Sequence, residues 1–223
     1  MHRGLKISVV IPCYNEEDGV RRVIESLPET VDEVVVVDNN CTDRTVEVAI
    51  SLGARVVEEK TPGYGAAYKR GLPAATGDVT ITMDGDATYP SEQINELVEY
   101  LVDNEVDFIS ASRFPLKDPK SMNFSNKMGN MILTVAMLVL YGKGVRDSQS
   151  GMWVYRTKVL PKLNLTSDGM PLSEEIKIEA IRAKDVRFVE CHIGYHPRIG
   201  EVKLNKWRDG FLNLWFLVKK RFQ

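Results

Sequence analysis

The most constraining feature of the sequence is the regular alternation of two patterns over its first half. Short runs rich in Val and Ile, such as EVVVVD at residues 33–38, alternate with segments of helical apolar spacing, such as SEQINELVEYLV at residues 91–102. Continuously apolar strands that alternate with amphipathic helices form βαβ units, because helices cover both faces of the sheet. The pattern predicts an α/β fold with a mostly parallel, Rossmann-like sheet flanked by helices. The expected strands are residues 6–12, 33–38, 54–59, 78–84 and 106–112.

The second half of the sequence is less regular, but it shows no linker and no internal repeat. We expect an apolar helix at about residues 123–141, a loop at 142–156, a helix at 171–183 and an extended segment at 186–197. The last segment, residues 205–222, again has helical apolar spacing. The 223 residues are therefore expected to form one domain with a C-terminal extension.

Composition excludes several classes of protein. The formal net charge of −2 is not that of a nucleic-acid binder. Three cysteines without CxxC spacing argue against a disulfide framework or a zinc site and fit a reducing cytosol. The first residues contain no signal-peptide core, and no apolar run reaches the roughly 18 residues that span a bilayer. These features predict a cytoplasmic protein.

Polar residues follow several of the expected strands, at the edge where open α/β sheets bind ligands. Asp84 and Asp86 flank Gly85 directly after the fourth strand, and Asp38, which could accept hydrogen bonds from a nucleotide's base or ribose, ends the second. Two carboxylates so close repel each other, and Mg²⁺ or Mn²⁺, held by one or two carboxylates plus substrate phosphate oxygens, would offset the repulsion. A solvated Asp-Gly turn is the alternative, but the position after a parallel strand favours a metal site.

Three further motifs have simpler structural explanations. GYGAAY at residues 63–68 is a near miss of the dinucleotide fingerprint and follows the wrong strand, so we expect a glycine turn that opens a helix and bounds the pocket. Asp43 and Ser91 are predicted helix caps. Gln149 lies in a polar loop and either offers a carbonyl oxygen to the metal or is an ordinary loop residue.

Charged residues of the second half are candidates for the chemistry. Arg198 and Lys203 lie in a glycine-containing loop and could stabilise a diphosphate leaving group, with a solvated basic loop as the alternative. Glu174 and Glu175 lie at a helix start, where a carboxylate also favours the helix dipole. They are the candidates for a general base if the acceptor is a hydroxyl group.

The C-terminal helix is expected to carry a single apolar stripe. Its members are Trp207, Phe211, Leu214, Trp215, Val218 and Phe222. Such a helix can lie in a membrane interface, with Trp207, Phe211 and Trp215 as lipid contacts. The alternatives are packing against its own domain or against another subunit of a homo-oligomer.

Taken together, these motifs resemble the family-2 glycosyltransferases of the GT-A fold, and within them the dolichyl-phosphate mannose and glucose synthase branch. The resemblance rests on VVIPCYNEE, VVDNNCTDRT, GYGAAYKRG, MDGDATYP, ASRF, DSQSGMWVYR and PRIGEVKL, in this order. It implies transfer of a hexose, with inversion, from a nucleotide-sugar (GDP-mannose, UDP-glucose or UDP-N-acetylglucosamine) to a polyprenyl phosphate. Many relatives in that branch have Ala where this chain has Gly85, a change that keeps both carboxylates.

The resemblance also implies roles for individual residues. Residues 1–113 would form the nucleotide-sugar-binding half, 114–203 the acceptor side and 204–223 the amphipathic helix. The nucleotide pocket would be lined by Pro12, Tyr14, Glu16 and Asp38. Asp84 and Asp86 would bind metal and diphosphate, with Gln149 completing the metal shell. Three basic residues would lie at the phosphates, Arg113 after the fifth strand and Arg198 and Lys203 in a mobile loop.

The acceptor decides whether a general base is needed. A phosphate monoester is largely dianionic at neutral pH, because its second pKa is about 6, and can attack without losing a proton. Since the chain lacks the transmembrane tail of many relatives, it would reach its lipid peripherally, on the cytoplasmic face of a membrane. The alternatives are a soluble family-2 enzyme with a hydroxyl acceptor and a non-catalytic nucleotide-sugar-binding membrane scaffold.

Overall fold

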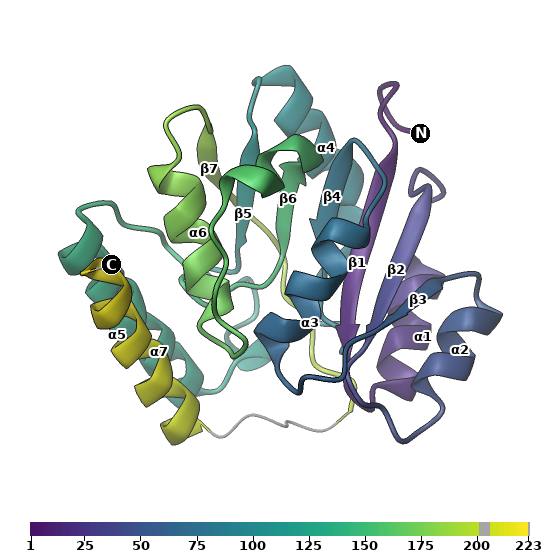
Figure 1. The fold of residues 1–223 in the computed structure, drawn as a ribbon, viewed down its shortest axis with the longest axis horizontal. Coiled ribbons are helices and arrows are strands. Elements are labelled where there is room, and N and C mark those ends of the chain that lie inside the picture. Colours follow the sequence, from purple (N-terminus) through teal and green to yellow (C-terminus); the bar gives the residue numbers. More distant parts are fainter. Residues whose placement is uncertain (201–205, 223) are drawn as a thin grey trace.

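The described residues form one seven-stranded sheet in the order β3-β2-β1-β4-β6-β5-β7. The computed structural model describes residues 1–200 and 206–222 (Figure 1). Only β6 runs antiparallel to its neighbours, so the predicted mostly parallel α/β sheet is confirmed. The strands are β1 (Ile7–Cys13), β2 (Glu33–Asp38), β3 (Arg55–Glu58), β4 (Val79–Thr82), β5 (Phe108–Ser112), β6 (Trp153–Arg156) and β7 (Phe188–His192).

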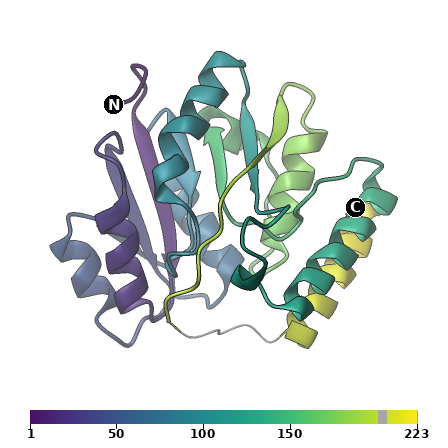
Figure 2. The ribbon, with the colours of Figure 1, turned by 180° about the vertical axis from the view of Figure 1, so that it is seen from behind.

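Helices cover both faces of this sheet. They are α1 (Glu17–Ser26), α2 (Thr45–Ser51), α3 (Tyr64–Gly71), α4 (Ile94–Asp103), α5 (Phe124–Tyr141), α6 (Leu172–Arg182) and α7 (Lys206–Arg221). Alternate residues of β1 face opposite sides: Val9 and Ile11 pack with α1, α2 and α4, whereas Val10 packs with α3 and α6. Figure 2 shows α1 and α4 in front of the sheet, on the face opposite to α3 and α6.

The fourth and fifth predicted strands are not adjacent, because β6 lies between them. β6 pairs antiparallel with both β4 and β5, where the sequence led us to expect a loop. Its four residues are too short to show a period, and its pairing depends on distant groups. The hydroxyl of Thr82 donates to the Gly151 carbonyl at 2.7 Å and accepts from the Trp153 amide at 2.8 Å. The position of β6 between β4 and β5 brings residues 147–151 to the carboxyl edge of β4.

Neither predicted cap is the N-cap residue itself, but Asp43, one residue before the N-cap Arg44, does bond to the first turn of α2. Asp43 Oδ1 accepts the Thr45 amide of α2 at 3.0 Å, and its Oδ2 accepts the Glu17 amide of α1 at 3.3 Å. Ser91 instead begins a short 3₁₀ turn, and its hydroxyl donates to the Ser26 hydroxyl at 2.9 Å. α4 itself begins three residues later, at Ile94.

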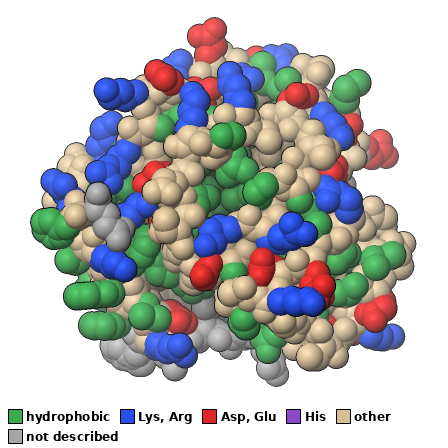
Figure 3. Space-filling view, in the orientation of Figure 1, with side chains coloured by type: hydrophobic (Ala, Val, Ile, Leu, Met, Phe, Trp, Pro, Cys, Tyr) green, Lys and Arg blue, Asp and Glu red, His purple; other side chains and the backbone are tan. Residues whose placement is uncertain are grey.

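Helices α5 and α7 form a separate pair at one end of the sheet. They run side by side (Figures 1 and 2), and a small cluster formed by Leu133, Met137, Val145, Ile178 and Leu217 ties them to α6. Figure 3 shows hydrophobic side chains gathered along the left edge, over the position of this pair. No helix of the described residues is both long enough and apolar enough to cross a bilayer.

Candidate active site

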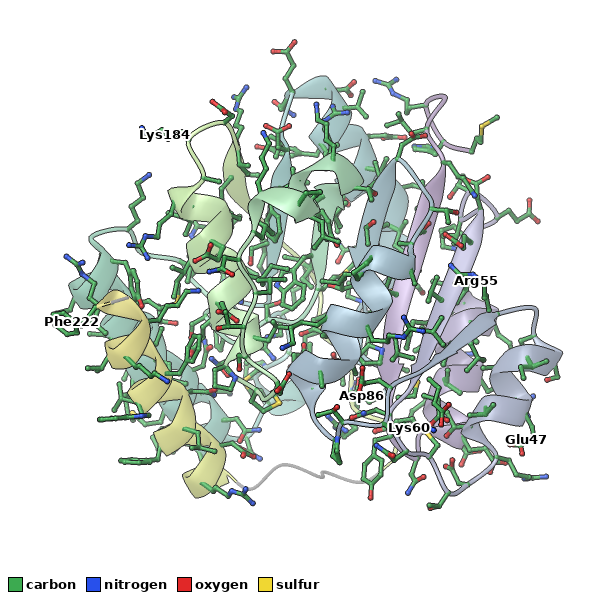
Figure 4. The ribbon with its side chains drawn as sticks, in the orientation of Figure 1. Glu47, Arg55, Lys60, Asp86, Lys184 and Phe222 are labelled. Atoms are coloured by element: carbon green, nitrogen blue, oxygen red, sulfur yellow. The ribbon has the colours of Figure 1, made fainter. Side chains whose placement is uncertain are left out.

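A cleft of about 780 Å³ opens at the carboxyl ends of β1, β2 and β4. This is the edge at which open α/β sheets bind ligands. Among the predicted site residues, the structure brings together Pro12, Tyr14, Glu16, Asp84, Asp86 and Arg198 in its lining. In Figure 4, Asp86 lies near this edge of the sheet, on the same side as Lys60.

Asp84 and Asp86 share the cleft but have different surroundings. Asp86 is buried, and its Oδ1 accepts the amide and the hydroxyl of Thr88 at 3.0 and 2.7 Å. Its Oδ2 is 2.6 Å from the guanidinium of Arg198. Asp84 accepts one long hydrogen bond, 3.5 Å, from the Tyr64 hydroxyl. Burial and the negative charge of Asp86 raise the pKa of Asp84 to about 7. The positive charge around the two carboxylates is therefore not enough to balance both of them in their ionised form.

The donor set fits a magnesium or manganese ion that is shared with a substrate. In the part of the chain that the structure describes, no group of three or more His, Cys, Asp or Glu side chains is placed to hold a metal ion. Two carboxylates are nonetheless enough for these ions when phosphate oxygens and water supply the other ligands. Burial raises the pKa of Asp84, and the charge of Asp86 raises it further by a repulsion that a bound cation would offset.

Gly85 is required here by close packing. A Cβ atom at this position would lie 2.9 Å from the sulfur of Cys13 and 3.4 Å from Cβ of Glu16. The cysteine that ends β1 therefore explains why the residue between the two aspartates is glycine. The GYG motif has a similar origin, because Cβ atoms at Gly63 and Gly65 would meet the carbonyls of residues 167 and 168 at 2.2 Å. This agrees with the expected glycine turn at the start of a helix.

Gln149 has partners other than the carboxylate pair. Its amide nitrogen donates to Glu174 Oε1 at 2.7 Å, and its amide oxygen accepts from Asn213 of α7 at 3.1 Å. Gln149 is not part of the cleft lining. We therefore do not retain the expectation that it completes a metal shell; its side chain links α6 to α7.

Neither Glu174 nor Glu175 is available to a substrate hydroxyl, so the expected general base is corrected. Both side chains are fully buried and neither lines the cleft. Glu175 accepts the amides of Thr166 and Ser167, both at 2.9 Å, and an ion pair from Lys220 at 2.8 Å. Glu174 has one oxygen bonded to Gln149 and one buried oxygen without a partner among the described residues. Burial raises the pKa of Glu174 to about 8.

Glu174→Gln is expected to stabilise the protein increasingly as the pH rises. Between about pH 4.5 and 8 the unfolded chain loses the Glu174 proton while the folded protein keeps it, so this carboxyl lowers wild-type stability across that window. Gln keeps the oxygen that accepts from Gln149 and does not titrate. The gain in free energy of unfolding is expected to be small at pH 5 and up to about 4 kcal/mol at pH 8. Urea unfolding at both pH values measures it.

Glu175→Gln is the matched control for this experiment. It weakens the contact with buried Lys220 and is expected to lower stability at both pH values. A Glu174→Gln effect of equal size at pH 5 and pH 8 would show that the carboxyl is ionised in the folded protein.

Arg113 lies outside the cleft lining but contributes charge to it. Its guanidinium forms two hydrogen bonds with the buried Asp147, at 2.7 and 2.8 Å, and lies 5.1 Å from the ring centre of Tyr195. The positive charge of Arg113 lowers the pKa of Asp84, although burial outweighs it. The structure therefore places Arg113 next to the site rather than among the groups that line it.

The loop that carries Arg198 runs along the carboxylate pair. The Ile199 amide donates to the Asp86 carbonyl, and the His196 amide donates to the Thr88 carbonyl, both at 2.9 Å. Arg198 also lies 3.8 Å from Glu16. Lys203 and the side chain of Trp207 lie outside the described residues, so their expected roles stay predictions.

Several cleft residues were not predicted from the sequence. Asn39, rather than Asp38, lines the cleft next to β2; Asp38 Oδ1 accepts the Cys41 amide at 2.8 Å. Tyr64 lines it from α3, and its neighbouring glycines were the available signal. Arg208, Asp209 and Leu212 line it from α7. Nothing in the sequence indicates that the C-terminal helix returns to the carboxyl edge of the sheet.

The sheet order and the acidic pair at its carboxyl edge define a GT-A fold. The chain belongs to glycosyl transferase family 2, whose family model matches residues 8–163. It is therefore a glycosyltransferase, as the sequence motifs implied.

Two relatives from Haloferax volcanii show the degree of similarity. A low-salt glycan biosynthesis hexosyltransferase is 35% identical over 219 residues, which are 95% of this chain and 53% of that protein, so the chain spans about half of its length. A dolichyl-phosphate hexose transferase is 34% identical over 208 residues, 92% of this chain and 89% of that protein.

Solved structures confirm the GT-A fold. Glucosyl-3-phosphoglycerate synthase of Mycobacterium tuberculosis superposes with a TM-score of 0.76 at 23% identity, over 98% of this chain and 81% of that one. The same enzyme with Mn²⁺, UDP-glucose and phosphoglyceric acid gives a TM-score of 0.74 at 22% identity, with 98% and 80% covered. At this identity the likeness supports the fold alone.

Proposed function

We propose that the protein transfers a hexose from a nucleotide-sugar to a polyprenyl phosphate at a membrane surface, with inversion and with Mg²⁺ or Mn²⁺ in the cleft. The names of its relatives support this branch of the family: besides the dolichyl-phosphate hexose transferase, a dolichol-phosphate mannosyltransferase of Pyrococcus furiosus is 30% identical over 215 residues, 90% of this chain and 59% of that protein. The observation that supports a polyprenyl-phosphate acceptor is the orientation of α7.

Helix α7 turns its polar side inward and its apolar side outward. Asn213, Leu217 and Lys220 are buried, and Lys220 pairs with Glu175 and Glu179 at 2.8 and 3.1 Å. Phe211 and Trp215, of the predicted stripe, are 69% and 60% exposed. A helix at the surface of a soluble protein normally has the opposite orientation. The stripe is therefore not packed against its own domain.

Helix α5 extends the same exposed surface. We call the exposed apolar side chains of the two helices the apolar face: Phe124, Met128, Met131, Ile132, Val135, Leu138 and Val139 of α5 and Phe211, Leu212, Leu214, Trp215 and Val218 of α7, with Phe222 beyond its end. Contiguous apolar surfaces of this kind mark sites of membrane or protein binding. Figure 3 shows part of this surface.

The apolar face is continuous with the catalytic cleft. Leu212 belongs to both, and Arg208 and Asp209, in the first turn of α7, also line the cleft. An acceptor with its polyprenyl chain in the bilayer would therefore present its phosphate to the cleft without leaving the membrane. Such an acceptor needs no general base, which agrees with the burial of Glu174 and Glu175 away from the cleft.

The residues of the chain would act mainly by electrostatics. Asp84 and Asp86 would hold the metal, and when bound it would neutralise charge on the departing nucleoside diphosphate. Arg198 would exchange its contact with Asp86 for a contact with the diphosphate, and Lys203 of the same loop would contact the diphosphate as well. Pro12, Tyr14, Glu16 and Asn39 would bound the nucleotide.

The test is a transfer assay with defined donors and acceptors. The purified protein is incubated with Mn²⁺, a polyprenyl phosphate and GDP-mannose, UDP-glucose or UDP-N-acetylglucosamine in turn. We expect lipid-linked sugar from one donor. Metal-dependent hydrolysis of one donor without lipid product would retain the glycosyltransferase and indicate a hydroxyl acceptor. Donor binding without turnover would indicate the scaffold.

A further inference from the structure

A second cavity of about 310 Å³ lies at the end of the helix pair that is remote from the cleft. Its apolar wall is formed by Met137, Ile178 and Ile181. Tyr141 and three cations complete the lining: Lys143, Arg182 and Arg221. We call it the basic pocket.

The basic pocket and the catalytic cleft lie at opposite ends of α7. Arg208 lines the cleft and Arg221 lines the pocket, and a rise of thirteen helical steps separates them by roughly 20 Å. Tyr141, Arg182 and Arg221 are the last residues of α5, α6 and α7. In Figure 1 the C-terminus marks this end of the pair. The apolar face extends from one cavity to the other.

The pocket has an excess of positive charge. Among the described residues, none of its three cations forms an ion pair with a carboxylate, whereas the neighbouring Lys220 pairs with both Glu175 and Glu179. Three helix ends contribute roughly half a negative charge each, and Lys220 offsets only one of its two carboxylate partners, so the net positive charge is at most about one and a half. The guanidinium of Arg182 lies 5.9 Å from the ring centre of Tyr141, which holds it over the pocket.

We infer that the basic pocket binds the phosphate of an anionic phospholipid headgroup. The inference rests on the membrane docking of the apolar face proposed above. Val139 and Phe222, 75% and 83% exposed, are close in sequence to the pocket residues Tyr141 and Arg221. A lipid whose phosphate contacts the cations therefore has its acyl chains beside the apolar face. Phosphates lie at the level where an interfacial helix pair meets water, so the charge and the apolar surface match one ligand.

This contact has a consequence for catalysis. A helix pair attached only by its apolar face can rotate and tilt in the interface. A second contact, about 20 Å from the cleft, fixes the tilt and holds the mouth of the cleft toward the lipid phosphates. The basic pocket is therefore a positioning site for the membrane-bound enzyme.

The experiment measures vesicle binding of the full chain and of two double variants. One variant is Arg182→Gln/Arg221→Gln. The control, Arg22→Gln/Lys184→Gln, removes the same charge at two exposed residues outside the pocket. Figure 4 labels Lys184 at a distance from Phe222. Binding is measured on phosphatidylcholine vesicles and on vesicles that also contain phosphatidylglycerol.

We expect the wild type to prefer the phosphatidylglycerol vesicles and the pocket variant to bind them roughly 25-fold more weakly, at about fivefold per cation. Both double variants should bind phosphatidylcholine as the wild type does. Arg182→Lys/Arg221→Lys should keep most of the preference, because it keeps the charge.

Four results would overturn the inference. Equal binding of the wild type to both kinds of vesicle, or a control that loses the preference as fully as the pocket variant, would do so and leave the docking of the apolar face intact. Inorganic phosphate that binds vesicle-free protein through the pocket, without any lipid preference, would identify a soluble-phosphate site instead. A wild type that binds neither kind of vesicle overturns the docking as well.

Discussion

Replacing Asp86 by Asn is expected to lower turnover by a factor of about 10² to 10³ while leaving the fold intact. Asn has the same shape and keeps an oxygen to accept the amide and hydroxyl of Thr88, which anchor the loop after β4. The variant loses the charge on the oxygen that now pairs with Arg198 at 2.6 Å. That oxygen is the proposed metal ligand. Its negative charge would hold the ion that neutralises the departing diphosphate. Initial rates at saturating donor and metal measure the loss.

Asp78→Asn is the control for Asp86→Asn. Asp78 is an exposed aspartate that precedes the same strand, at its amino end, where it accepts the Lys6 amide at 2.9 Å. Its neutralisation is expected to change the rate by less than about twofold. If Asp86→Asn kept a tenth or more of the wild-type rate, the carboxylate pair would not be the metal site.

The first half of the fold could be predicted because its signals are local. The runs that form β1 to β5 are continuously apolar, and the intervening helices have a clear period, so the βαβ order follows from the sequence. The place of the cleft follows from that order, because parallel strands end at one edge. Asp84 and Asp86 were therefore placed at this edge without knowledge of any contact, whereas Pro12 and Glu16 were assigned to the pocket by the family resemblance.

The remaining features depend on contacts between distant parts of the chain. β6 is recognisable as a strand only through its two partners, β4 and β5. Glu174 and Gln149 look like polar site residues in the sequence, but the two hydrogen-bond to each other, and Gln149 also accepts from Asn213 of α7. The spacing of α7 predicts an apolar stripe correctly, yet it cannot show which side faces the protein. Buried partners for Asn213 and Lys220 decide that, and they lie 64 and 45 residues away along the chain.

The outward orientation of α7 leads to the second large effect, the loss of membrane binding in Phe211→Ser/Trp215→Ser. Each side chain exposes roughly 100 Å² of apolar surface, which contributes about 2.5 kcal/mol when it enters a membrane interface. Together they should change partitioning into vesicles by a factor on the order of 10³. Flotation with phosphatidylcholine vesicles measures it. Since both side chains are exposed, the fold and metal-dependent donor hydrolysis should be retained.

The matched control separates this effect from a general loss of apolar surface. Ile50 and Tyr100 are also exposed, at 59% and 42%, but lie on α2 and α4, away from the helix pair. Ile50→Ser/Tyr100→Ser should float with vesicles as the wild type does. Transfer to a long polyprenyl phosphate in vesicles should fall with flotation, whereas transfer to a short, water-soluble prenyl phosphate should not. If Phe211→Ser/Trp215→Ser still floated but changed the sedimentation coefficient, the apolar face would be an interface between subunits, and the lipid would have to reach the cleft by another route.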